Sequence, residues 1–122
     1  MKSFYVAVLG MLVVSWVFFL AAVPTAFASD REIVMEAQAF SPQMTTIHVG
    51  QRVTWRNHDK QEHFLTSSGP ESRPVATEAR DLEFNQQMIP GSEYSHAFKE
   101  PGVYAYFCAI HEGMSGTIVV KP

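Results

Sequence analysis

Three side chains near the C-terminus have the types and the spacing of metal ligands. Cys108, His111 and Met114 follow the pattern Cys-x2-His-x2-Met, and Cys108 is the only cysteine of the chain. A thiolate, an imidazole and a thioether are donors of a trigonal copper site with a weak axial methionine, which needs only one further imidazole. Zinc also accepts cysteine and histidine, but a thioether suits it poorly. The pattern therefore favours copper.

The further imidazole must come from elsewhere in the chain, and two histidines compete for the role. His63 opens an apolar segment that is typical of a strand, whereas His58 lies in the polar run 57–62. We favour His63 and keep His58 as the alternative. His96 alternates with aromatic residues, so we expect a half-buried, hydrogen-bonded side chain rather than a ligand. We expect His48 on the surface of a strand.

Two carboxylates flank the candidate ligands. Glu62 precedes His63, and Glu112 follows His111. Solvated carboxylates are the ordinary expectation for such residues. The alternative is that one of them approaches the metal in place of Met114.

The first 28 residues have the organisation of an export signal. Lys2 is followed by an uncharged apolar run from Phe4 to Val23, and Ala26-Phe27-Ala28 has the small-x-small form of a cleavage site. We expect cleavage after Ala28 and work in the periplasm or another extracytoplasmic space. The alternative is an uncleaved membrane-anchoring helix over residues 4–23, because this run is long enough to cross a bilayer. In an oxidising compartment, metal ligation would protect the lone thiol.

The remainder, residues 29–122, predicts one small domain. It has 94 residues and a formal charge of −4, because Lys2 is the only charged residue before it. A chain of this length forms one modest core. Its mildly acidic charge and lack of basic runs give no reason to expect binding to nucleic acid.

Short stretches of β-branched and aromatic residues, separated by Gly, Pro, Asn, Asp and Ser, predict an all-β domain. Several short strands at this spacing are typical of a sandwich or a barrel. We expect residues 67–81, which contain two prolines and mixed charges, to form an exposed loop. The expected strands are Glu32–Glu36, Thr45–Val49, Arg52–Arg56, His63–Thr66, Glu93–Phe98, Val103–Cys108 and Gly116–Val120.

Two longer motifs resemble the small cupredoxins of the plastocyanin and pseudoazurin type, and the short ligand loop is most similar to that of amicyanin. The motifs are Ile47-x-Val49-Gly50-x-x-Val53-x-Trp55-x-Asn57 and Tyr104-x-Tyr106-x-Cys108-x-x-His111-x-x-Met114-x-Gly116. The resemblance implies a Greek-key β-sandwich over residues 29–122 that holds one type 1 (blue) copper. It implies His63, Cys108 and His111 as equatorial ligands and Met114 as the axial ligand.

The chain departs from the family pattern beside the ligands. Relatives commonly carry Asn after the first ligand histidine and Ser or Thr after the cysteine, where this chain has Phe64 and Ala109. Because both polar partners are replaced together, no unpaired group remains. We expect the backbone N–H of Phe64 to reach the cysteine sulfur. Ile110 stands where short-loop relatives often have proline, so its N–H is a second candidate donor to the sulfur.

The function that the resemblance implies is single-electron transfer between redox proteins, with no enzymatic activity. We expect a monomer whose partners dock on an apolar patch beside His111, formed by Ile110 and Met114. The alternative is a periplasmic copper-binding or copper-delivery protein without an electron-transfer role. Such a protein would favour several exposed Met or His ligands, whereas Cys108 indicates a tight, closed site.

Overall fold

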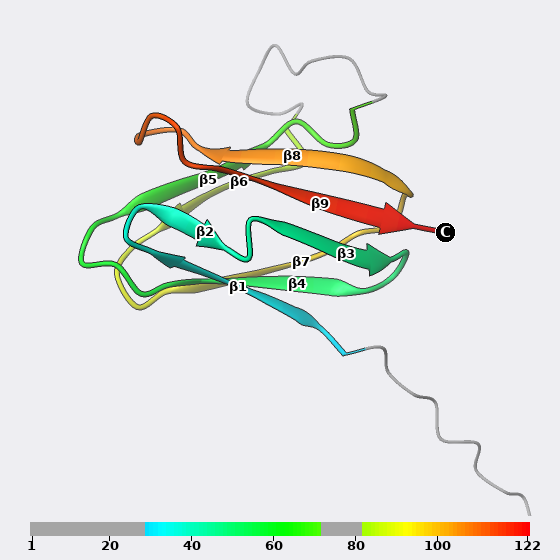
Figure 1. The fold of residues 1–122 in the computed structure, drawn as a ribbon, viewed down its shortest axis with the longest axis horizontal. Helices are drawn as coiled ribbons and strands as arrows, with labels where there is room; N and C mark the ends of the chain where they lie inside the picture. Colours follow the sequence, from blue (N-terminus) through cyan, green and yellow to red (C-terminus); the bar gives the residue numbers. More distant parts are fainter. Residues whose placement is uncertain (1–28, 72–81) are drawn as a thin grey trace, which may run out of the picture.

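The computed structural model describes residues 29–71 and 82–122, and these residues form nine strands in two sheets (Figure 1). The predicted export segment 1–28, with its helix, and residues 72–81 of the predicted loop lie outside the described residues. Within the described ranges, no helix is long and apolar enough to span a membrane. The prediction of an all-β sandwich is confirmed for this part of the chain.

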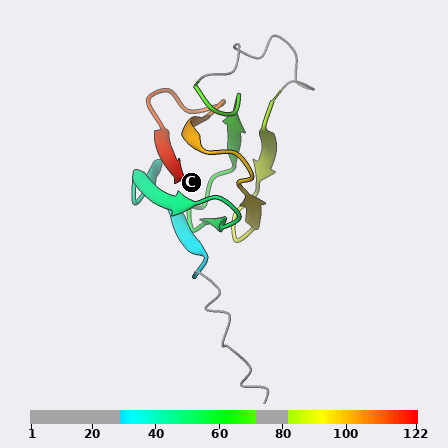
Figure 2. The same ribbon diagram turned by 90° about the vertical axis from the view of Figure 1, so that its right-hand side faces the viewer.

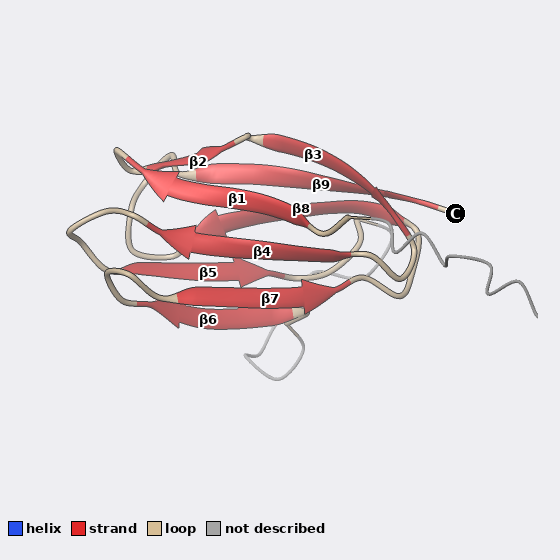
Figure 3. Ribbon diagram, turned by 90° about the horizontal axis from the view of Figure 1, so that it is seen from below, coloured by secondary structure: helices blue, strands red, loops and turns tan. Residues whose placement is uncertain are grey.

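The first sheet has the strand order β2-β1-β4-β7, and the second has the order β3-β9-β8-β5-β6. The β1–β4 and β3–β9 pairs are parallel, and the other pairs are antiparallel. Figure 1 shows the two layers from the side, Figure 3 looks onto their faces with the strands of one layer over those of the other, and Figure 2, along the strands, shows that the layers surround a common interior. The strands are β1 (Arg31–Glu36), β2 (Ala39–Ser41), β3 (Met44–His48), β4 (Arg52–Asn57), β5 (His63–Ser67), β6 (Phe84–Met88), β7 (Glu93–Ala97), β8 (Gly102–Cys108) and β9 (Ser115–Lys121).

Seven of these strands overlap the seven predicted stretches, whereas β2 and β6 were not predicted. β2 has only three residues, which is too short for an alternating pattern to be recognised. β6 reads Phe-Asn-Gln-Gln-Met, with three consecutive exposed polar residues between two buried ends. Its central residues have little preference for strands, so pairing with β5 determines its conformation.

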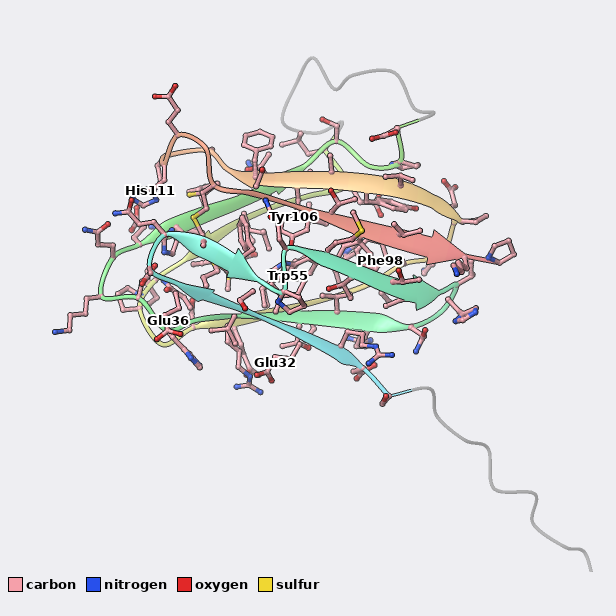
Figure 4. All side chains as sticks on the ribbon, in the orientation of Figure 1. Glu32, Glu36, Trp55, Phe98, Tyr106 and His111 are labelled. Carbon is pink, nitrogen blue, oxygen red and sulfur yellow. The ribbon has the colours of Figure 1, made fainter. Side chains whose placement is uncertain are left out.

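An aromatic cluster centred on Trp55 fills the interior between the sheets. The side chain of Trp55 is fully buried, and its ring lies 5.2 to 6.5 Å from the rings of Phe84, Tyr94, Phe98 and Tyr106. Figure 4 shows Trp55, Phe98 and Tyr106 between the two layers. This packing fixes β8, which ends at Cys108, against β4 of the opposite sheet. The rigid core therefore determines where the candidate ligand strands end.

Candidate metal centre

Two strand ends and one loop bring the three strongest donors together. His63 is the first residue of β5, Cys108 is the last residue of β8, and His111 lies in the loop between β8 and β9. The β5–β8 register pairs Leu65 with Cys108, so the antiparallel strands place His63 and Cys108 at the same end of the sandwich. This end carries the orange β8–β9 loop in Figure 1, opposite the C-terminus.

The donor atoms of these residues form a small triangle. The Nδ1 atoms of His63 and His111 are 3.1 Å apart, and Cys108 Sγ lies 3.3 Å from His111 Nδ1 and 3.8 Å from His63 Nδ1. The circle through these three atoms has a radius of about 2.0 Å, which is close to metal–nitrogen and metal–sulfur bond lengths of roughly 2.0–2.3 Å. A single metal ion therefore fits between the three donors.

The chemistry of the donors selects the kind of metal. Two imidazole nitrogens and one thiolate form the trigonal set of a type 1 copper site. The set is largely shielded from water, because the side chain of His63 is fully buried and that of Cys108 is 4% exposed. His111 is half-buried, and Figure 4 shows it at the loop-bearing end of the sandwich. The site is closed except at this histidine.

Met114 lines the same pocket as Cys108 and His111. The volume of this pocket is about 350 Å³. Its side chain is 3% exposed, and its backbone carbonyl accepts a hydrogen bond from the Cys108 N–H at 2.9 Å. This hydrogen bond closes the ligand loop and holds Met114 beside the cysteine. Glu62 and Glu112 are exposed, and neither belongs to the group of clustered donors among the described residues.

Backbone groups join the two ligand-bearing segments. The N–H of Phe64 donates to Cys108 Sγ at 3.3 Å, as predicted, and the N–H of Ala109 donates to the Phe64 carbonyl at 2.9 Å. The second predicted donor was wrong: among the described residues, Ile110 makes no hydrogen bond to the sulfur. Among the described residues, the Phe64 N–H is therefore the backbone donor that withdraws charge from the thiolate.

The structure brings His63 rather than His58 to the donor cluster. His58 is exposed, although its backbone N–H donates to the Met35 carbonyl at 2.9 Å. His96 is half-buried, with Nε2 2.9 Å from Glu83 Oε1 and Nδ1 3.3 Å from the Tyr94 hydroxyl, as expected for a structural histidine. His48 is exposed at the end of β3.

Asp59 contacts the site although the sequence pattern did not single it out. Its Oδ2 lies 2.7 Å from His63 Nε2. Burial alone would raise the pKa of the Asp59 carboxyl, but hydrogen bonds from the Gln38 N–H, His63 and the Ala37 N–H outweigh burial and hold the pKa below its usual value. An acidic residue four positions before a candidate ligand histidine is the signal that could have identified it.

The surface around His111 is partly apolar. Ile110 is 52% exposed, and Ile89, in the turn that follows β6, is 55% exposed. Since Met88 pairs with His63, Ile89 also lies at the ligand end of the sandwich. The predicted contribution of Met114 to this patch was wrong, because its side chain is buried against the donors.

Comparison with known proteins agrees with this geometry. A family model described as Cupredoxin-like domain matches residues 9–120. Plastocyanin of Scenedesmus fuscus is 36% identical over 88 residues, which cover 70% of this chain and 89% of the relative. Amicyanin-alpha of Methylorubrum extorquens is 32% identical over 105 residues, or 84% of this chain and 81% of the relative.

Solved structures share the fold. A purple cupredoxin from Nitrosopumilus maritimus superposes with a TM-score of 0.61 at 30% identity, over 75% of this chain and all of that one. The reduced state of an amicyanin point mutant superposes with a TM-score of 0.64 at 24% identity, over 76% of this chain and 83% of that one. The two-sheet arrangement is therefore common to these proteins.

Proposed function

This chain belongs to the cupredoxin-like family, and we propose from that premise that it is an exported type 1 copper protein that carries single electrons between redox proteins. The observation that carries the proposal is the clustering of His63 Nδ1, Cys108 Sγ and His111 Nδ1 within 4.8 Å of one another. These three residues are the proposed equatorial ligands, and Met114 is the proposed axial ligand. When bound, copper supplies one-electron chemistry between Cu(I) and Cu(II).

The protein's own contribution is a donor set that changes little during electron transfer. His63 and Cys108 sit on adjacent strands of one sheet, and the Phe64 N–H and the Met114 carbonyl hold the segments around the sulfur. Donors fixed by strand pairing keep their positions in both oxidation states, which lowers the reorganisation that opposes electron transfer. The proposal is therefore a carrier and not an enzyme.

His111 is the proposed point of electron entry and exit, since it is the one clustered donor that is not buried. Exposed Ile110 and Ile89 support docking of partner proteins at this end, through a small and transient interface. The partners are redox proteins, and the carrier acts as a monomer. The sequence of residues 1–28 supports an extracytoplasmic location, with a membrane anchor as the alternative.

The alternative function, copper delivery, is less consistent with the site. A delivery protein must release copper readily to another protein. His63 is fully buried and Cys108 is nearly so, which hinders direct access to the proposed ligands. Slow loss of Cu(I) to an excess of a soluble chelator would support the carrier, and rapid complete loss would support delivery.

The proposal is tested by loading residues 29–122 with Cu(II) and recording the visible spectrum and the voltammogram. We expect an intense thiolate-to-copper charge-transfer band and a reversible one-electron wave. Cys108→Ser should abolish the band while circular dichroism still reports the folded sandwich. A wild-type protein without the band, or a Ser variant that keeps it, would contradict the ligand assignment.

A further inference from the structure

We infer that Asp59 is a positioning residue for the metal centre, because one carboxylate both orients the ring of His63 and holds the β1–β2 turn against the loop that precedes β5. The inference rests on the proposed function, since it treats His63 as a ligand. It adds a residue outside the ligand set and a physical link between the site and a distant turn.

The contact with Asp59 fixes the proton position on the His63 ring. A neutral imidazole has one N–H and one nitrogen with a free lone pair, and its surroundings decide which is which. Asp59 Oδ2 lies 2.7 Å from His63 Nε2, so Nε2 carries the proton and donates it to the carboxylate. Nδ1 then presents its lone pair toward Cys108 Sγ and His111 Nδ1. Asp59 therefore selects the nitrogen that faces the donor cluster.

The contact between His63 and Asp59 is largely buried. The His63 side chain is fully buried, and that of Asp59 is 15% exposed. A hydrogen bond between a histidine and a carboxylate is stronger when water is largely excluded, and it makes the other ring nitrogen a better donor to a metal. The carboxylate is itself held, because the Asp59 N–H donates to Oδ1 of the buried Asn57 at 2.9 Å.

The Asp59 carboxylate also holds the turn between β1 and β2. Ala37 and Gln38 have φ angles of 52° and 56°, in the left-handed region that residues other than glycine seldom adopt. Both backbone N–H groups donate to the Asp59 carboxylate, at 2.8 Å to Oδ1 and 3.1 Å to Oδ2. These hydrogen bonds offset the cost of the left-handed conformation.

A further contact joins the same two segments without involving the carboxylate. Gln38 Nε2 donates to Gln61 Oε1 at 3.0 Å. The turn and the loop before His63 therefore form one unit with Asp59 at its centre. A purely structural role for Asp59 would act through this unit, whereas the positioning role acts through the His63 ring, and the two roles can be separated by mutation.

The experiment compares Asp59→Ala, Ala37→Gly and the double variant in the copper-loaded protein. Glycine adopts the left-handed conformation without strain, and the change at Ala37 leaves the Gln38–Gln61 hydrogen bond in place, so Ala37→Gly should restore stability lost from the turn. We expect Asp59→Ala to weaken Cu(II) binding by roughly 10–100-fold, the range for residues that hydrogen-bond to ligand histidines. We also expect a higher reduction potential, because a weaker His63 donor favours Cu(I). The double variant should recover stability without recovering affinity or potential.

Glu62→Gln is the matched control, because it removes a carboxylate next to His63 that hydrogen-bonds to Gln87 and does not touch the ring. It should leave affinity and potential unchanged. In the Zn(II)-loaded protein, nitrogen NMR should find the His63 proton on Nε2 in the wild type. If Asp59→Ala does not fold, Asp59→Asn is measured in its place, and we expect a smaller change in the same direction because a neutral amide oxygen is a weaker acceptor than a carboxylate.

Wild-type affinity and potential in Asp59→Ala, or recovery of both in the double variant, would overturn the inference. A wild-type protein without the charge-transfer band would instead refute the proposed function. The two failures are therefore distinguishable.

Discussion

The ring of Tyr106 lies directly on the backbone of Gly116, the residue that pairs with it between β8 and β9. A Cβ atom at position 116 would be 2.3 Å from both Cζ and the hydroxyl oxygen of Tyr106, far inside van der Waals contact. Tyr106 is 1% exposed and precedes Cys108 by two residues. The Tyr106 ring therefore occupies the space that a side chain at position 116 would need. Glycine at this position allows the strand that carries Cys108 to pack with Tyr106 buried.

Gly116→Ala should destabilise the fold by about 1–3 kcal/mol, the usual cost of overpacking a core. The Tyr106 ring would have to move, and the surrounding aromatic rings leave little room for it. Urea unfolding of both proteins measures the difference. Adding Tyr106→Leu should make the further effect of Gly116→Ala smaller, and an equal effect in both backgrounds would show that the ring is not the obstacle.

Because the Tyr106 hydroxyl is buried, we expect the folded state to lose stability at high pH. Burial raises the pKa of Tyr106 to about 12, and the nearby Trp55 indole opposes this shift without outweighing it. Neither the Tyr106 hydroxyl nor Trp55 Nε1 has a partner with hydrogen-bond geometry among the described residues. The folded state thus binds the phenol proton more tightly than the unfolded state, where the pKa is about 10. The stabilisation is complete below pH of about 10 and is lost as the pH rises toward 12, for a total of roughly 3 kcal/mol.

Tyr106→Phe should therefore lose less stability than the wild type between pH 10 and pH 12. Urea unfolding at a series of pH values measures both curves, and the other tyrosines and lysines contribute equally to each. Parallel curves would show that the buried phenol does not ionise in this range.

His63→Ala should disrupt the charge-transfer band of the copper protein, whereas His58→Ala should leave it largely intact. The reason is that His63 Nδ1 lies beside the sulfur and His111, while His58 is exposed and outside the donor cluster. Visible and electron paramagnetic resonance spectra of the two variants decide between them. Loss of the band in the His58 variant alone would move the first ligand to position 58.

Ile110→Lys should slow electron self-exchange between Cu(I) and Cu(II) molecules by roughly tenfold, a change equivalent to about 1.4 kcal/mol. Two molecules that meet at His111 would have to bury the added charge. Line broadening in NMR spectra of mixed oxidation states measures the rate without a partner. Val49→Lys, at the opposite end of the sandwich and 41% exposed, is the control for net charge. Equal rates in both variants would place the contact elsewhere.

Ile110→Pro should change the reduction potential by less than about 59 mV, which corresponds to a tenfold change in a one-electron equilibrium. The sequence indicated the Ile110 N–H as a second donor to the sulfur, and loss of such a hydrogen bond would lower the potential. The structure instead gives the Phe64 N–H as the donor, at 3.3 Å, and the Ile110→Pro change does not remove it. Voltammetry of the copper protein measures the shift. A marked decrease in the reduction potential would show that the Ile110 N–H does donate to the sulfur.

The features that could be read from the sequence are those determined by residues close to one another in the chain. The spacing of Cys108, His111 and Met114 fits a single loop, and the stretch Arg52–Arg56 predicted the strand that the structure has as β4, in which Val53 and Trp55 are buried. Each of these patterns is local, because strand periodicity and loop length act over a few residues.

Only the tertiary structure decided how distant segments meet. The register of β5 against β8 brings His63 to the sulfur, and the packing of the β1–β2 turn on the next loop brings Asp59 to His63. The hydrogen bond from the Phe64 N–H to the sulfur and the existence of β6 also depend on neighbours far away in the chain. A hydrogen bond or a strand pair between such segments depends on the relative placement of both backbones, which no pattern within either segment specifies.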